Sequence, residues 1–143
     1  MEPSNQWYGG RLMDLTSREC SELLRAVRVG RVAWCTPEGP VVIPVNFVFH
    51  EGAVWIRSTP YSALARGSAL TSDVSHRMSF EVDGIDEMTQ SGWSVLARGH
   101  ATWHAVSDLP VGLPDLDPWP EGARTLVVSI DVIELTGKRM LPS

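Results

Sequence analysis

One short segment of the chain concentrates side chains that bind phosphate. Arg57, Ser58, Thr59 and Ser62 place one guanidinium and three hydroxyls within six residues. The planar donors of an arginine match two phosphate oxygens at once. The segment leads into a predicted helix over Tyr61–Leu70, whose first amides would be unpaired and lie at the positive end of the helix dipole. These residues therefore predict a phosphate site, with simple capping of that helix by Ser or Thr as the alternative.

The other reactive side chains form no recognisable catalytic or metal-binding set. His100 and His104 share one face of a predicted strand but lie about 13 Å apart, too far to chelate one ion. Cys20 and Cys35 have no companion at metal-ligand spacing, which predicts free thiols in a reducing compartment. The sequence contains no Ser-His-Asp or Cys-His signature. It therefore predicts no metal site and identifies no catalytic residue.

The composition predicts a single packed domain. The chain has 143 residues, of which 43% are hydrophobic, enough for one core. Its net charge of -5 and the scatter of its basic residues argue against nucleic-acid binding. No apolar run reaches the ~18 residues that a membrane span needs, and the first fifteen residues do not resemble a signal peptide. We therefore expect a cytoplasmic protein that binds neither nucleic acid nor membrane.

The phosphate segment must be positioned mainly by strands. Residues 1–14 are predicted to form a flexible N-terminal arm, and residues 15–143 the domain. Thr16 and Glu19 form a capping box that begins a helix with one apolar face, which Gly30 would end. Alternating hydrophobicity and turn residues then predict strands over 31–36, 41–50, 53–58, 77–83, 92–106 and 124–135. Within them, Pro44 indicates an edge strand or a bulge, and Gly99 a bulge or a bend.

This order of elements predicts a mainly β fold with short helices (α+β), built as an antiparallel sheet of six strands that closes into a small barrel. The Pro- and Asp-rich segment 107–122 is long for a connection, which is typical of a functional loop.

Several motifs follow one another along residues 15–140. They include Val29-Gly30-Arg31-Val32-Ala33, Pro44-Val45-Asn46-Phe47, Ile56-Arg57-Ser58-Thr59, Phe80-Glu81-Val82-Asp83, Gly92-Trp93-Ser94-Val95 and Pro118-Trp119-Pro120. In order and spacing they resemble the pyridoxamine 5'-phosphate oxidase-like family, whose members are FMN-binding split β-barrels.

The resemblance implies a homodimer that holds FMN at its interface and acts as an oxidoreductase on a small molecule. Arg57, Ser58, Thr59 and Ser62 would bind the phosphate next to Ala63. Val45, Asn46 and Ile56 would lie along the flavin or its ribityl chain. Trp93, Ser94 and Trp119 would come from the partner chain. Such a cofactor site combines apolar walls with a few fixed polar groups.

Ala63 departs from the family pattern, which has a Lys at this position. Loss of one charged hydrogen bond removes about 1.5–3 kcal/mol, so phosphate affinity would fall about ten- to a hundred-fold. This departure leaves three alternatives open: a deazaflavin in place of FMN, haem, or a non-catalytic protein that binds cofactor weakly or not at all.

Overall fold

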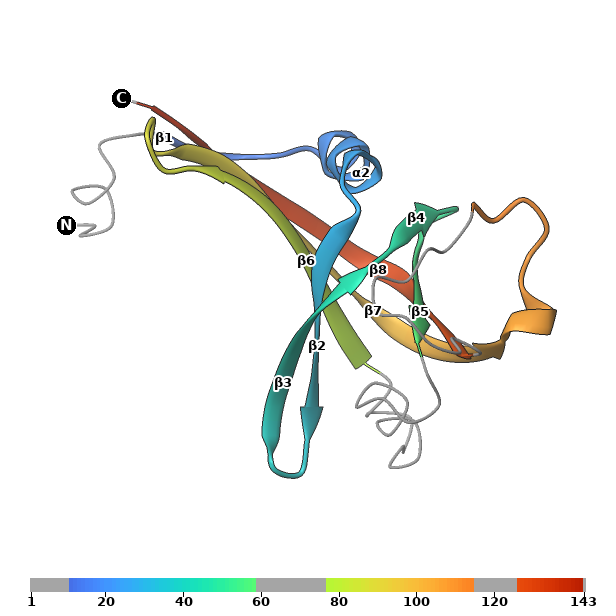
Figure 1. Ribbon diagram of the computed structural model, residues 1–143. Coiled ribbons are helices and arrows are strands. Elements are labelled where there is room, and N and C mark those ends of the chain that lie inside the picture. Colours follow the sequence, from blue (N-terminus) through green and yellow to red (C-terminus); the bar gives the residue numbers. More distant parts are fainter. Residues whose placement is uncertain (1–10, 59–76, 115–125, 143) are drawn as a thin grey trace.

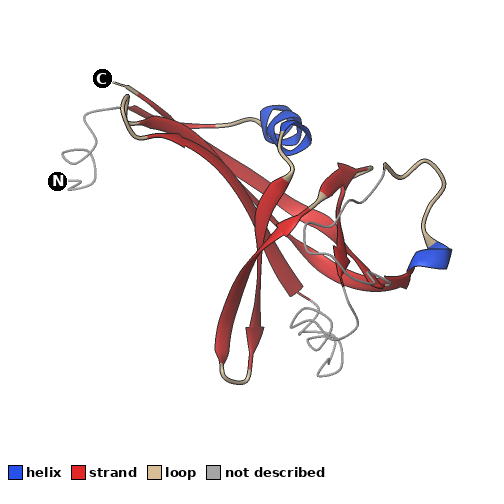
Figure 2. Cartoon of the chain, viewed as in Figure 1, coloured by secondary structure: helices blue, strands red, loops and turns tan. Residues whose placement is uncertain are grey.

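The computed structural model describes residues 11–58, 77–114 and 126–142 (Figure 1). Strands dominate these residues, as Figure 2 shows. In chain order the elements are β1 (Arg11–Asp14), α2 (Ser17–Ala26), β2 (Val29–Thr36), β3 (Gly39–Asn46), β4 (Val48–His50), β5 (Ala53–Ser58), β6 (Arg77–Asp86), β7 (Ser91–Ala105), the 3-10 turn η2 (Val106–Asp108) and β8 (Leu126–Leu141). The arm predicted over residues 1–14 thus includes β1, and the helix predicted over 61–70 lies outside the described residues.

The strands form one antiparallel sheet in the order β3-β2-β6-β7-β8-β5-β4, and β1 pairs with the far end of β8. The predicted mainly β, antiparallel fold is confirmed. The predicted number of six strands is not, because the described residues contain eight. β3 and β4 stand at opposite ends of this order, yet only Phe47 separates them in the chain. The chain itself therefore links the two ends of the sheet, and Pro44 lies on an end strand, where its missing N–H is tolerated.

Phe47 explains why the strand predicted over 41–50 is two strands. Its ring is 4% exposed and meets the ring of Phe80 edge-on, with centroids 4.5 Å apart. Its amide donates to the carbonyl of Arg28 at 3.0 Å. On either side of this residue, β3 pairs with β2 and β4 pairs with β5. The burial of one aromatic ring thus divides the strand between two neighbours.

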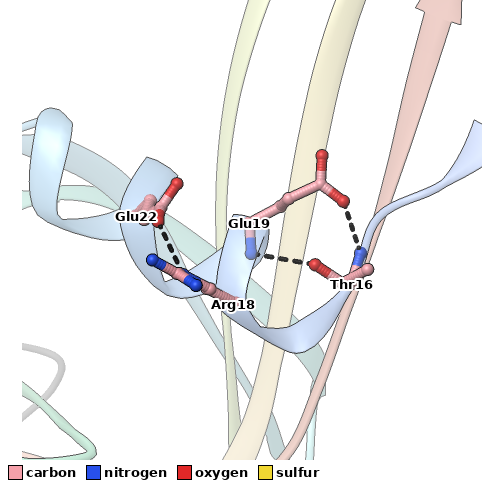
Figure 3. A network of polar contacts seen from close by, with 4 residues as sticks. All are labelled: Thr16, Arg18, Glu19 and Glu22. Atoms are coloured by element: carbon pink, nitrogen blue, oxygen red, sulfur yellow. Dashed lines mark hydrogen bonds and ion pairs between the residues drawn. The ribbon is translucent and has the colours of Figure 1, made fainter.

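Helix α2 begins at the predicted capping box (Figure 3). The Thr16 hydroxyl accepts the Glu19 amide at 3.2 Å, and the Glu19 carboxylate accepts the Thr16 amide at 3.0 Å. The predicted apolar face is confirmed, since Cys20 and Leu24 are fully buried. The predicted stop is wrong: α2 ends at Ala26, and Gly30 lies within β2.

β6, β7 and β8 form a long ribbon that extends past α2 to the chain's C-terminal end, where β1 joins it (Figure 1). The sequence predicts that the final strand ends at residue 135, but β8 continues to Leu141. β7 pairs with β8 on one side. On the other side β5 pairs with the first part of β8 and β1 with its last part. The predicted bulge is confirmed by a register shift at Arg98/Gly99. A Cβ on Gly99 would lie 2.0 Å from the Asp131 carbonyl oxygen, so only glycine fits there.

The core lies between α2 and the face of the sheet that packs against it. Its largest fully buried side chains are Phe80, Leu24, Ile56, Ile130, Val32, Val54, Val82, Val95 and Val128. Within the described ranges, no helix is both long and apolar enough to span a bilayer.

Candidate functional site

The predicted phosphate segment begins on β5, where alternate residues face opposite sides of the sheet. Ile56 is 1% exposed and belongs to the core, and Ser58 on the same side is also buried. Arg57 faces the other side and is half-buried. The remaining predicted phosphate ligands, Thr59 and Ser62, and the neighbouring Ala63 lie outside the described residues.

Val45 and Asn46 lie at the end of β3, and both are half-buried. Directly after Phe47, Val48 pairs with Trp55 on β5. Asn46 and Arg57 are each two residues from this pair, on opposite strands. The fold therefore brings the end of β3 and the end of β5 to the same region of the molecule.

Trp93 and Ser94 lie elsewhere, near the tip of the ribbon. Trp93 is directly opposite Gly84, where a Cβ would come within 2.7 Å of the indole nitrogen. Glycine at this position therefore leaves the space that the tryptophan ring occupies. Trp119, the third residue predicted to come from a partner chain, lies outside the described residues.

A hollow of about 460 Å³ surrounds Trp93 and Ser94, and we call it the tip hollow. β1, β6, β7, β8 and the turn between β6 and β7 line it, with Leu12, Ile85, Asp86, Glu87, Gln90, Ser91, Gly92, Trp93, Ser94, Lys138 and Met140. Its walls are largely apolar, with two carboxylates, Asp86 and Glu87, and one cation, Lys138, which contacts Asp14. Sequence reasoning missed Leu12 and Lys138, because both lie on strand segments that the hydrophobic pattern did not predict.

The described members of the two sets of predicted site residues lie far apart along one chain. Arg57 pairs with Val127 near the start of β8, whereas Trp93 pairs with Arg139 near its end. Twelve residues separate these two positions on β8, which corresponds to about 40 Å of extended strand. This distance exceeds the length of a flavin mononucleotide, so residues of one chain do not form a single site from both sets.

A group of charged side chains lies beside the tip hollow, on the same face of the sheet as Ser94. Arg31 contacts Glu81 at 3.3 Å and Asp83 at 3.1 Å, and Asp83 is opposite Ser94. Burial, together with the hydrogen bond and charge of Asp83, raises the pKa of Glu81 to about 7, although Arg31 opposes this rise. Glu81 therefore exchanges a proton near neutral pH.

A second polar pair, not anticipated from the sequence, lies on the face that carries Arg57. His104 Nε2 is 2.8 Å from Ser129 Oγ, and the Trp55 ring packs against the imidazole at 5.2 Å between centroids. Ser129 is 2% exposed, and the described residues provide no carboxylate that orients His104. This pair therefore lacks the third member and the open access of a hydrolytic triad. In the described part of the chain, no three His, Cys, Asp or Glu side chains gather as metal ligands.

Comparison with known proteins connects this arrangement to one family. The profile of the pyridoxamine 5'-phosphate oxidase family matches residues 16–139. The uncharacterized protein Rv0080 of Mycobacterium tuberculosis is 30% identical over 134 residues, covering 91% of this chain and 86% of that protein.

Two solved structures share the fold. A provisionally assigned pyridoxamine 5'-phosphate oxidase of Corynebacterium glutamicum superposes with a TM-score of 0.73 at 25% identity, covering 92% of this chain and 95% of that one. An FAD-binding protein of Mycobacterium smegmatis superposes with a TM-score of 0.65 at 24% identity, covering 90% of this chain and 98% of that one.

Proposed function

The chain belongs to the pyridoxamine 5'-phosphate oxidase family, and on this basis we propose that it acts in the cytoplasm as a homodimer that binds a flavin, with FMN as the preferred form. Arg57, Ser58, Thr59 and Ser62 hold the phosphate, beside Ala63. Val45 and Asn46 lie along the ribityl chain and the ring, whereas the Ile56 side chain is buried in the core and does not contact them. Trp93, Ser94 and Trp119 reach the same cofactor from the partner chain.

The main support for this proposal is the separation along β8 between Arg57 and Trp93. Measured along β8, Arg57 and Trp93 of one chain lie about 40 Å apart, so a flavin that uses both must lie between two chains. A homodimer with two-fold symmetry creates two such sites, each combining the β3 and β5 ends of one chain with the ribbon tip of the other.

The chemistry of the tip hollow fits an isoalloxazine ring. Leu12, Ile85, Trp93 and Met140 supply apolar and aromatic walls for a large flat ring, and Lys138 supplies a cation. When bound, a flavin supplies hydride or electron transfer, which makes the protein an oxidoreductase of small molecules in this proposal. The protein's own contribution is to hold the ring and exclude water around it.

Ala63 favours a second candidate function. Because the chain lacks the lysine that the family places there, the phosphate has one charged contact fewer. The alternatives to FMN binding are that the protein binds a deazaflavin or haem, or that it is non-catalytic and binds a cofactor weakly or not at all.

The visible absorption spectrum of the purified protein, with mass spectrometry of any small molecule released on denaturation, distinguishes these candidates. Flavin absorption bands, or saturable quenching of FMN fluorescence by colourless protein, support FMN binding. A colourless protein that does not quench FMN fluorescence would refute it. Ala63→Lys should tighten FMN binding about ten-fold or more if the segment contacts the phosphate, and unchanged affinity would show that it does not.

A further inference from the structure

A second hollow, of about 680 Å³, lies on the outer face of the sheet, and none of the flavin ligands that the structure describes lines it. We call it the bulge hollow, because the bulge of β7 and β8 forms part of its wall. Its lining residues are Ala33, Trp34, Cys35, Pro40, Arg77, Met78, Ser79, Arg98, Gly99, His100, Ile133 and Glu134. Its volume falls within the range of sites for small organic molecules.

Basic side chains gather in this hollow from two neighbouring strands. Arg77 on β6 is directly opposite His100 on β7, and Arg98 is opposite Ser79, two residues further along the same face. Cationic groups directly across a strand pair repel each other when both are charged. A bound anion would replace this repulsion between the cationic side chains with attraction to the anion.

Carboxylates neutralise only part of this charge. Arg98 contacts Glu134 at 3.4 Å, and both side chains are more than half exposed, so the contact is weak. Asp131 is opposite His100 on β8 but forms no ion pair with it. Among the described residues, Arg77 has no carboxylate partner. Among the described lining residues, two arginines, Arg77 and Arg98, thus face one carboxylate, Glu134.

The bulge adds an apolar wall to this cationic group. Register passes directly from the Gly99–Val132 pair to the Arg98–Glu134 pair, so Ile133 has no partner on β7. Its side chain is 70% exposed and lines the hollow. Bulges re-aim side chains and are frequent next to functional sites. Here the bulge, which requires glycine at position 99, places an apolar side chain beside two arginines.

We propose that the bulge hollow binds a small organic anion, namely a phosphate monoester or a carboxylate with an apolar body. The anionic group lies among Arg77, Arg98 and His100, where guanidinium donors match two of its oxygens. The apolar body lies against Ile133. This ligand is additional to the flavin, because its site contains none of the described flavin ligands.

Cys35 provides a direct assay, because it lines the hollow and is exposed whereas Cys20 is buried. Iodoacetamide therefore alkylates Cys35 in the folded protein, and a bound ligand slows this reaction. The probes are phenyl phosphate, benzoate and inorganic phosphate. The measurements use an Arg57→Ala background, so that phosphate binding at the proposed flavin site does not contribute and a failure of one proposal leaves the other testable.

We expect saturable protection of Cys35 by phenyl phosphate or by benzoate, and the more effective of the two identifies the anionic group. Arg77→Ala should raise the half-protecting concentration about ten-fold or more, with each rate compared with that of the same variant without ligand. Ile133→Ser should weaken protection by the aromatic probe but not by inorganic phosphate. Arg18→Ala, a matched surface arginine on α2, should change neither.

If Arg77→Ala does not fold, Arg98→Ala tests the same group from β7. Absence of saturable protection by both aromatic probes up to their solubility limits would overturn the proposal. So would protection that survives both arginine substitutions, because binding would then not depend on the cationic group.

Discussion

Replacement of Glu81 by Gln should stabilise the protein above neutral pH but not in mild acid. The pKa of Glu81 is raised from 4.5 to about 7 by burial and by Asp83. Between these two values the folded protein keeps a proton that the unfolded chain releases, so the free energy of unfolding falls as pH rises through this window. Above pH 7 the folded protein bears the full cost of the buried charge. Gln removes that cost and keeps groups that can hydrogen-bond to Asp83 and Arg31.

The size of the effect follows from the same residues. A pKa difference between about 7 and 4.5 corresponds to roughly 3 kcal/mol in a fully shielded site. The Glu81 side chain is 35% exposed, and water screens such a group, so about 1–2 kcal/mol is the realistic gain. For a chain of this length the gain raises the melting temperature by about 3–8 °C.

Thermal unfolding at pH 5 and at pH 8 measures this difference. Glu81→Gln should raise the melting temperature at pH 8 and leave it nearly unchanged at pH 5. Glu22→Gln is the matched control, because Glu22 is exposed and pairs with Arg18 at the helix surface, so its effect should be small at both pH values. An equal gain at both pH values, or a loss at pH 8, would refute the reasoning.

Two further substitutions test the fold. Thr16→Ala removes the hydroxyl that caps α2 and should lower the free energy of unfolding by about 1 kcal/mol in urea, whereas Ser17→Ala, one residue later, should have a smaller effect. Gly99→Ala places a Cβ 2.0 Å from the Asp131 carbonyl oxygen and should cost about 3 kcal/mol or abolish folding, because backbone must move. A Gly99→Ala protein with unchanged stability and spectra would show that the bulge does not require glycine.

The sequence predictions are confirmed for features that have a signal among neighbouring residues. The capping box of α2 depends only on Thr16 and Glu19, and the bulge was marked by a glycine within a strand pattern. The signal for each feature lies within a few neighbouring residues, so one sequence is sufficient to detect it.

The features that sequence reasoning missed depend on contacts between distant segments. Phe47 divides a strand because its ring packs against Phe80, 33 positions away. β8 continues through Thr136 and Gly137 because β7 and β1 pair with it. The bulge hollow likewise requires the register that sets Arg77 opposite His100. Hydrophobic periodicity carries no information on such pairings.

The tip hollow combines residues that the sequence predicts as site residues with residues that it does not. Trp93 and Ser94 belong to a recognisable motif and were selected as site residues, but Leu12, Lys138 and Met140 come from strand segments without a clear local signal. Sequence therefore indicated one wall of the hollow, and the fold supplied the others.

Complementation between two defective chains tests the central claim, that one flavin is held by two chains, most directly. Arg57→Ala and Trp93→Ala each remove one half of every proposed site, so each variant alone should lose FMN binding while remaining folded by melting temperature. When the two are co-expressed, every mixed dimer contains one intact site, formed by the unmodified Arg57 of one chain and the unmodified Trp93 of the other. We predict that FMN binding returns in the mixed dimers. Mixed dimers that bind no more FMN than the separate variants would contradict the account.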